Sequence, residues 1–435
     1  MTRTKSLPIL DTAGGRRPSR PSRDATAHLL RQVSVQSVIE IVLQQGEVSR
    51  SGIAELAGIS KQTASAVVSH LEDGGWLRAT GVSRKAYGRS AVTYEICQDA
   101  AFVFAVDLGC TKIRAAIAGL GGRILCEQTV PTDQRGGARV TAQIGGLLAQ
   151  MRTEAAIPAE KIHNAVIGTP GVLDPETGQI GCAPNLAGFD GFDTAQALTA
   201  AVGIPLIVEN DVNLAMLGEH WAGRGADDMA LISLGTGVGM GVMVNGALVR
   251  GARGFAGEIA YLPFGAPLTE PQSLQSGAFE RGVSAAAIRG RYEAHGGVPN
   301  RTVRQIFDQL RLDEPAAAAA VEETAQLVAR GIATVVAVLD PRCVILGGSI
   351  GAREELLRAV RRALPNIMLR EVELIPSGLG DRATVTGAVA VALRRLHTEL
   401  FGIQDMLATP LSLPRSPTLT ASHEEVWPDD SVLSE

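Results

Sequence analysis

The sequence predicts an α/β protein with a winged helix-turn-helix ahead of its main domain. Near the N-terminus, three stretches carry apolar residues at helical spacing, followed by two alternating stretches around a basic segment. Further along, four apolar runs typical of strands buried on both faces each end in an acid, an amide or a glycine. Such residues gather where the carboxyl ends of parallel strands line one crevice. The runs are residues 102–106, 204–208, 229–234 and 343–346.

Length and composition limit what the chain can be. At 435 residues it is long enough for two or three domains, and 46% of its residues are hydrophobic. No run reaches the roughly 18 apolar residues of a membrane-spanning helix, and the N-terminus lacks the apolar core of a signal peptide. The five cysteines show no paired spacing, so neither a disulfide framework nor a zinc cluster is indicated. We therefore predict a cytoplasmic protein without a membrane partner.

Charge is unevenly distributed along the chain. Residues 1–99 hold 13 Lys and Arg against 9 Asp and Glu, a net +4, whereas the remainder holds 27 against 36, a net −9. This asymmetry places any polyanionic partner at the N-terminal part. Residues 1–27 are rich in Arg, Ser, Pro and Thr without periodicity, which predicts a disordered basic tail. The tail is either a solvated leader or a segment that touches DNA phosphates.

Residues 28–98 are predicted to form the winged helix-turn-helix. The first helix has its apolar stripe at Val35, Val38, Ile39 and Val42 and stops at Gly46. Ser49 caps a second short helix, a turn follows at Gly58, and Ser60 caps a third helix. The third helix is predicted to bury Ala64, Val67, Val68 and Leu71. A short helix, a glycine turn and a second helix are the layout of a helix-turn-helix.

The polar residues of this unit predict binding to double-stranded DNA. The face of the third helix opposite its apolar stripe carries short polar side chains that suit a major groove. Strands at 78–81 and 91–96 flank a basic tip, which would reach phosphates or the minor groove. The predicted DNA contacts are Ser60, Lys61, Gln62, Thr63 and Ser65, with Arg84, Lys85 and Arg89 at the wing. The alternative is a helical protein-interaction module with a basic loop.

A glycine-rich segment marks the second half of the chain. The buried run 229–234 is followed directly by the turn Gly235-Thr236-Gly237-Val238-Gly239, where backbone N–H groups can converge on an anion. A second strand turns over at Asn245-Gly246, a strong hairpin signal. The segment closes on Glu258, which places a carboxylate on a glycine-rich loop. Taken alone, the turn could also be a tight turn without a ligand.

Five motifs in this order resemble the ROK family of repressors and sugar kinases, over roughly residues 100–402. They are DLGCTK (107–112), ENDVNLA (209–215), LGTGVGMG (234–241), GFAGEIAY (254–261) and LGGS (346–349). The resemblance implies a two-lobed RNase-H-like domain of the actin, hexokinase and Hsp70 type. Lobe one would span 100–211 plus a final helix at 384–400, lobe two would span 212–383 with helical sequence at 315–339, and 403–435 would be a disordered tail. ROK repressors also carry a wing with GRxxxxY, which Gly88, Arg89 and Tyr94 match.

The resemblance also implies roles for individual residues. Asp211 would be the general base that deprotonates a sugar hydroxyl, with Asn185, Asn210, Glu258 and Glu280 around the sugar. Asp107 would hold Mg²⁺. The nucleotide would lie against Gly109, Thr111, Lys112, Gly235, Thr236, Gly237, Gly347 and Gly348. ATP and Mg²⁺ are compatible with these loops, but no cofactor is required by the prediction.

The chain departs from the family pattern at the structural zinc site. Where the family has one histidine and three cysteines, this sequence has Tyr261, Pro271, Ser273 and Ala278. All four ligands are absent together, so we predict that no zinc is bound and that the loop carrying Glu258 and Glu280 lacks the zinc brace. The missing histidine also touches sugar in the kinases, which weakens the case for sugar binding in the kinase manner.

These observations lead to one interpretation and two alternatives. The first is a sugar-responsive transcription factor, a repressor of carbohydrate genes, acting as a homodimer or homotetramer. Its sugar effector would close the lobes and change the spacing of paired winged helices on the operator DNA. The second is an active ATP-dependent sugar kinase with an accessory DNA-binding domain. The third is a DNA-binding protein whose second half only dimerises.

Overall fold

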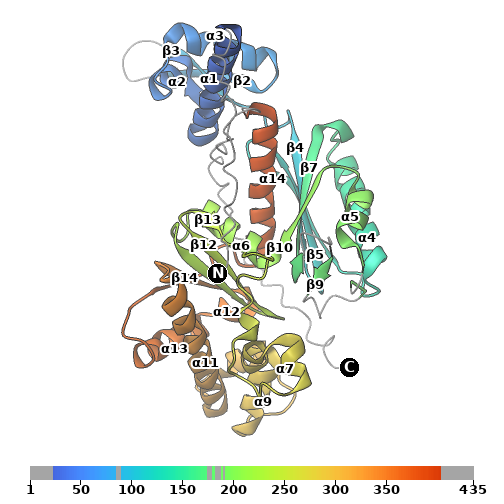
Figure 1. Ribbon diagram of the computed structural model, residues 1–435, viewed down its shortest axis with the longest axis vertical. Coiled ribbons are helices and arrows are strands. Elements are labelled where there is room, and N and C mark those ends of the chain that lie inside the picture. The colour runs from blue at the N-terminus through green and yellow to red at the C-terminus, as the bar shows by residue number, and fades with distance from the viewer. Residues whose placement is uncertain (1–22, 85–89, 174–178, 182–187, 190–191, 403–435) are drawn as a thin grey trace, which may run out of the picture.

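A computed structural model describes residues 23–84, 90–173, 179–181, 188–189 and 192–402 of the chain. Three units follow one another along its long axis: a small N-terminal unit, a first five-stranded sheet and a second five-stranded sheet with their helices (Figure 1). The predicted C-terminal tail lies outside the described residues. Within these ranges, no helix is both long and apolar enough to cross a membrane.

The N-terminal unit contains three helices and a three-stranded sheet in the order β1-β3-β2. Both predicted caps are confirmed: the Ser49 hydroxyl accepts from Gly52 N at 3.2 Å, and the Ser60 hydroxyl accepts from Thr63 N at 3.0 Å. The short strand β1 was not predicted. The elements are α1 (Arg23–Gln45), β1 (Val48–Ser49), α2 (Arg50–Leu56), α3 (Lys61–Asp73), β2 (Leu77–Arg84) and β3 (Ser90–Ile96).

Two boundaries of this unit differ from the prediction. Helix α1 begins at Arg23, inside the stretch predicted as a disordered tail and two residues after the helix breaker Pro21. The hairpin strands are longer than predicted, since β2 continues to Arg84 and takes up part of the expected wing loop. Residues 85–89, including Lys85 and Arg89, lie outside the described residues.

The first large sheet has the order β10-β7-β4-β5-β6, in which β4, β7 and β10 are parallel. Its two faces have separate cores. Phe104 and Val106 pack toward α4 and α5, whereas Val103 and Ala105 pack toward α14. The elements are β4 (Phe102–Leu108), β5 (Lys112–Gly119), β6 (Ile124–Pro131), α4 (Gly137–Glu154), η1 (Ala159–Lys161), β7 (Ile162–Thr169), β8 (Val172–Leu173), β9 (Ile180–Gly181), α5 (Thr194–Val202), β10 (Leu206–Asn210), α6 (Asp211–Trp221) and α14 (Ala383–Phe401).

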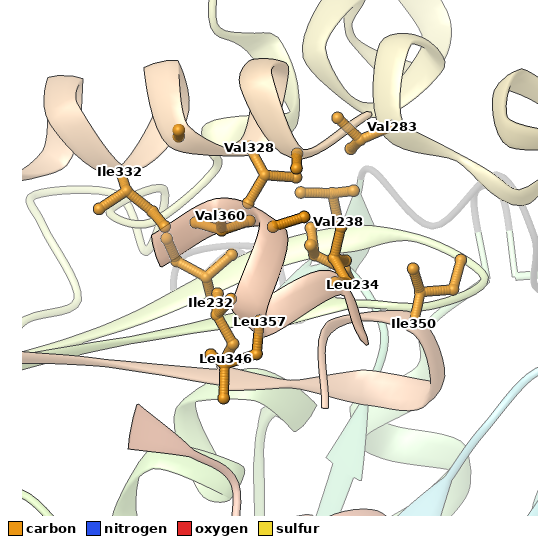
Figure 2. Packing of buried hydrophobic residues seen from close by; sticks show 14 of the residues in the cluster. Ile232, Leu234, Val238, Val283, Val328, Ile332, Leu346, Ile350, Leu357 and Val360 are labelled. Carbon is orange, nitrogen blue, oxygen red and sulfur yellow. The ribbon is translucent and has the colours of Figure 1, made fainter. Parts of the chain in front are cut away.

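The second large sheet has the order β13-β12-β11-β14-β15. Figure 2 shows its core, where Ile232 and Leu346 of the sheet meet Val328 of α11 and Val360 of α13. The predicted Asn245-Gly246 hairpin is confirmed, since Val244 pairs with Ala247. The elements are β11 (Met229–Leu234), β12 (Val238–Val244), β13 (Ala247–Leu248), η2 (Ile259–Tyr261), α7 (Pro271–Ser276), α8 (Ala278–Val283), α9 (Ala285–Ala294), α10 (Val303–Leu310), α11 (Pro315–Leu339), β14 (Cys343–Gly347), α12 (Gly348–Gly351), α13 (Glu354–Ala363), η3 (Leu364–Asn366), β15 (Glu373–Pro376) and η4 (Gly380–Arg382).

Helices α6 and α14 cross between the units and connect them. Helix α6 contributes Leu214 to the core of the first sheet and Met216 to the core of the second. Helix α14 lies against the first sheet and α6, and its far end reaches the N-terminal unit (Figure 1). There the ring of Phe401 stands edge-on to that of Trp76, with 5.4 Å between the ring centroids. One helix therefore contacts both the crevice region and the N-terminal unit.

Candidate functional site

In the first sheet, three neighbouring parallel strands place Asp107, Gly168 and Glu209 side by side. Asp107 at the end of β4 is level with Gly168 on β7, and Gly168 is level with Glu209 on β10. The next residues, Asn210 and Asp211, start helix α6. The predicted crevice edge is thus built from strands that are distant in sequence, as expected for carboxyl ends of parallel strands.

Asn210 is the N-cap of α6, and both the oxygen and the nitrogen of its side-chain amide form hydrogen bonds. Its Oδ1 accepts from the N–H groups of Val212 and Asn213, both at 3.0 Å. Its Nδ2 donates to Gly171 O at 3.0 Å, which ties the loop after β7 to the start of α6. Asn210 therefore fixes the backbone next to Asp211. The predicted sugar contact Asn185 lies outside the described residues.

Asp211 has the environment expected of a general base. Burial raises the pKa of its carboxyl to about 7; the hydrogen bond from Val212 N, at 2.8 Å to Oδ1, opposes this shift and the nearby Glu258 charge adds to it. A carboxylate with a pKa near neutrality can accept a proton from a hydroxyl. The hydroxyl of Thr384, at the start of α14, donates to the backbone oxygen of Asp211 at 3.3 Å.

Four carboxyl groups, those of Asp107, Asp211, Glu258 and Glu280, form a series in which each is close enough to influence the pKa of a neighbour. Burial and the Asp211 charge raise the pKa of Asp107 to about 7, and burial with the Glu280 charge raises that of Glu258 to about 6. Burial also raises the pKa of Glu280. In the described part of the chain, none of these four forms an ion pair within 4.0 Å. A site of this composition offers acceptors to several hydroxyl donors, which suits a polyol.

We expect the raised pKa of Glu258 to make folding depend on pH. The folded pKa of about 6 exceeds the ordinary 4.5, so the folded state binds the proton more strongly and stability falls as pH rises through about 6. Glu258→Gln should therefore raise the melting temperature at pH 8 by about 3 °C, and by less at pH 5. Thermal melts at both pH values measure this, with Glu399→Gln as control for one lost charge. An equal shift at both pH values would contradict the assignment.

The two glycine loops of the second sheet lie side by side. Ser233, which precedes the Gly235–Gly237 turn, pairs with Gly347 on β14. A Cβ on Gly348 would fall 2.3 Å from Leu234 O, so only glycine permits this approach of the loops. The structure thus brings together the predicted nucleotide residues of this sheet. Asp107, with phosphate oxygens and water, would hold the Mg²⁺ that such a nucleotide carries.

The first predicted nucleotide loop, after β4, is a tight hairpin whose basic residues are already paired. Gly109 N donates to Lys112 O at 3.0 Å, and Thr111 O accepts from Thr132 N at the same distance. Lys112 Nζ lies 3.1 Å from Asp381 Oδ2, and the buried Arg114 also pairs with Asp381. Sequence reasoning missed Asp381 because it lies far along the chain, just before α14.

The loop that replaces the zinc site is held by hydrogen bonds. Arg281 donates to Ser273 Oγ at 2.5 Å and to Glu270 Oε2 at 2.6 Å, while Ser273 Oγ donates to Pro267 O at 2.7 Å. Tyr261 OH donates to Gln275 O at 3.0 Å. These side chains are committed to other partners and do not fit a tetrahedral zinc ion. The Arg281 guanidinium crosslinks the loop at the place where the family pattern has the zinc site. The absence of zinc stays a prediction.

Removing this crosslink should destabilise the protein, whereas a chelator should not. Arg281→Met is expected to lower the free energy of unfolding by about 1–3 kcal/mol, because charge-assisted hydrogen bonds in a partly buried place are removed. Arg358→Met, at an exposed pair on α13, should cost less than about 0.5 kcal/mol. Denaturant unfolding with and without EDTA, plus elemental analysis, measures both effects. Stoichiometric zinc, or a melting temperature lowered by EDTA, would contradict this account.

The predicted DNA-contacting face is present on α3. Lys61, Gln62 and Thr63 are exposed. Ser65 is instead approached by Arg50, whose Nη1 donates to its hydroxyl at 3.5 Å. Arg50 also pairs with Glu72 and lies 5.0 Å from the centroid of the Tyr94 ring, so it ties α2 to α3 and β3. Sequence reasoning missed Arg50, whose position directly after the cap Ser49 was the available signal.

The two large sheets and the helices α6 and α14 that join them define a hexokinase-like α/β domain behind an N-terminal unit of helices and a small sheet. The chain belongs to the ROK family, whose model matches residues 103–395. A putative xylose repressor from Caldicellulosiruptor sp. strain Rt8B.4 is 25% identical over 402 residues, covering 88% of this chain and 98% of that protein. A glucokinase from Halalkalibacterium halodurans is 31% identical over 308 residues, covering 65% of this chain and 92% of that protein.

Solved structures of a sugar kinase and of a transcriptional regulator also resemble this chain. A ROK hexokinase from Thermus thermophilus matches with a TM-score of 0.56 and 31% identity, covering 68% of this chain and 99% of its own. A ROK family transcriptional regulator, described as a homologue of the E. coli MLC protein, has a TM-score of 0.66. Its 20% identity over 86% of this chain and 98% of its own indicates a shared fold. The regulators' matches reach into the N-terminal unit, whereas those of the kinases cover about two thirds of the chain.

Proposed function

We propose that this protein is a DNA-binding transcriptional regulator of carbohydrate genes, a repressor controlled by a sugar bound in the crevice. The observation that carries this proposal is the similarity to xylose repressors over 88% of the chain, which reaches into the N-terminal unit. Kinases of the family match a shorter part of the chain. We propose residues 28–98, together with the start of α1 at 23–27, as the DNA-binding domain, and 100–402 as the sensor.

The N-terminal unit is proposed to be a winged helix-turn-helix. Helices α2 and α3 are joined by a turn at Gly58, whose φ of +64° suits glycine, and β2 and β3 form the hairpin of the wing. The exposed Lys61, Gln62 and Thr63 at the start of α3 are proposed to contact base edges of the operator. The wing residues Arg84, Lys85 and Arg89 would contact phosphates.

Helix α14 is proposed to carry the signal between sugar and DNA. Its first turn contacts Asp211 through Thr384, and its last residue contacts Trp76. Its 19 residues span about 28 Å, so one rigid element links the two sites. A sugar that closes the lobes would shift α14 against the N-terminal unit and change the spacing of two such units in a homodimer or homotetramer.

The proposal is tested by selecting bound duplexes from a random DNA library with the full chain. Enrichment of one sequence with two related half-sites is expected, as for a symmetric dimer. A thermal-shift screen of hexoses, pentoses and amino sugars then finds the effector, which should also change the affinity for the selected duplex. No enrichment above a random pool would overturn the proposal.

The second candidate is an ATP-dependent sugar kinase with an accessory DNA-binding domain. The raised pKa of Asp211 and the adjoining glycine loops favour it. A coupled assay over common sugars tests it, with Asp211→Asn as control. Turnover near or above about 1 s⁻¹ that vanishes in Asp211→Asn would make the kinase the better account, since this is the lower end for working enzymes. We expect slower turnover or none.

A further inference from the structure

The N-terminal unit and the sensor share one hydrophobic cluster. The cluster includes Leu71 of α3 and Phe401 of α14, and Trp76 packs against it. Ala101 is also buried in it, at the end of residues 97–101, which connect the two units. Side chains buried in a common core hold their segment in place, whereas a flexible linker remains solvated. The two units are therefore packed together and not joined by a loose tether.

Within the connecting residues, Gln98 is bonded to the turn between β5 and β6 by both its backbone and its side chain. Its backbone oxygen accepts from Leu120 N at 3.2 Å, and its Oε1 accepts from Gly121 N at 3.1 Å. Directly before it, Cys97 N donates to Trp76 O at 2.9 Å. The connection is thus hydrogen-bonded to the N-terminal unit on one side and to the first sheet on the other.

His397 of α14 is bonded to the same turn. Its side chain is fully buried, and its Nε2 lies 2.8 Å from Leu120 O. Because a carbonyl oxygen can only accept, Nε2 carries the proton. Burial lowers the pKa of His397, which keeps the ring neutral. Leu120 therefore joins Gln98, through its N–H, to the helix whose first turn contacts Asp211.

Two separate attachments limit rotation of the N-terminal unit on the sensor. A single contact could act as a pivot, but the edge-on pair of Trp76 and Phe401 adds a second attachment to the same helix. A movement of α14 is then passed on to the unit and is not absorbed in the connection. On DNA, each base pair between two half-sites moves the second one by about 3.4 Å and turns it by about 35°. The orientation of the units thus decides which spacing fits.

We infer that Gln98 and His397 are positioning residues that fix the N-terminal unit on the sensor and thereby determine the spacing of the operator half-sites. This rests on the proposed function, because it assigns residues to the spacing of paired DNA-binding units. Both residues act through the turn, and neither belongs to the proposed DNA or sugar contacts. Their loss should change which spacings are accepted and leave recognition of a single half-site intact.

Nitrogen-15 relaxation of the full chain tests the joint without DNA. In the wild type, amides of α3 and of the first sheet should report one common rotational correlation time. His397→Phe keeps a ring but removes the Nε2 donor, and Gln98→Ala removes the side-chain acceptor. The double variant should give the N-terminal unit a shorter correlation time than the sensor. His397→Gln, whose amide can still donate, should keep the common value.

Selection from a DNA library with variable spacing measures the consequence for recognition. The wild type should enrich one spacing, whereas the double variant should enrich several adjacent spacings of the same half-site sequence. Affinity for a duplex with one half-site should stay within about threefold of the wild type, because no base or phosphate contact is removed. Val389→Ala opens a cavity elsewhere on α14, so it controls for lost stability and should keep the single spacing.

A single spacing retained by the double variant, when circular dichroism shows it folded, would overturn the inference. So would a wild-type N-terminal unit that tumbles independently of the sensor, or spacing that broadens equally in Val389→Ala. If the wild type enriches no half-site at all, the proposed function fails and the spacing role with it. The relaxation measurement does not involve DNA, so it still distinguishes a rigid joint from a loose one in that case.

Discussion

Replacing Arg84, Lys85 and Arg89 with alanine is expected to weaken DNA binding on the order of a hundredfold at low salt and to flatten its salt dependence. For every phosphate that is no longer neutralised, the slope of log K against log salt should fall by about 0.9, because fewer counterions are released on binding. The weakening should be similar for the selected duplex and for unrelated sequences, since phosphates carry no sequence information. Fluorescence anisotropy at several salt concentrations measures both quantities.

A matched control separates local from global electrostatics. Arg123, Arg139 and Arg394 are exposed on the sensor part of the chain, so replacing these three with alanine changes the net charge by the same amount. This variant should bind DNA within about threefold of the wild type, because screening limits the reach of exposed charges to about 10 Å. A salt slope that is unchanged in the wing variant, or equally reduced in the control, would count against the wing.

Gly387→Ala is expected to lower the free energy of unfolding by about 3 kcal/mol, although alanine is the better helix former. A Cβ on Gly387 of α14 would lie 1.8 Å from Leu214 O of α6, and one on Gly218 of α6 would lie 2.3 Å from Ala383 O. The colliding atoms belong to rigid backbone, so the helices must move apart. Because Asp211 begins α6 and Thr384 is in the first turn of α14, sugar binding should weaken as well.

Gly146→Ala makes the same chemical change at an open place in a helix. Gly146 is an exposed residue of α4, and a Cβ there would meet no atom within 4 Å. The substitution should raise the free energy of unfolding by about 0.5–1 kcal/mol, since alanine restricts the unfolded chain. Denaturant unfolding of both variants gives the comparison. Equal effects of the two substitutions would show that the α6–α14 crossing is looser than the structure indicates.

Sequence patterns were sufficient for most elements of the fold. The run 229–234 and the helix at 315–339 were placed with their observed bounds, and the caps at Ser49 and Ser60 were confirmed. In each case the signal is local: an apolar run, a helical period or a hydroxyl before a helix. Where the sequence has no strong signal that ends a helix or strand, the observed bounds differ from the predicted ones. This is the case at the start of α1 and along the hairpin of β2 and β3.

The sequence also determined which residue types meet at the crevice, because strands that end in acids and glycines must align at one edge of a parallel sheet. The sequence could not determine which of those groups already have an ion-pair or hydrogen-bond partner within the protein. Lys112 pairs with Asp381, Arg281 crosslinks the loop that lacks the zinc ligands, and Glu280 accepts a hydrogen bond from Val238 N. These partners are joined by packing across distant segments, so no local period or spacing encodes them. Only the tertiary structure decided that the N–H of Val238, directly after the glycine turn, donates to a carboxylate of the same chain.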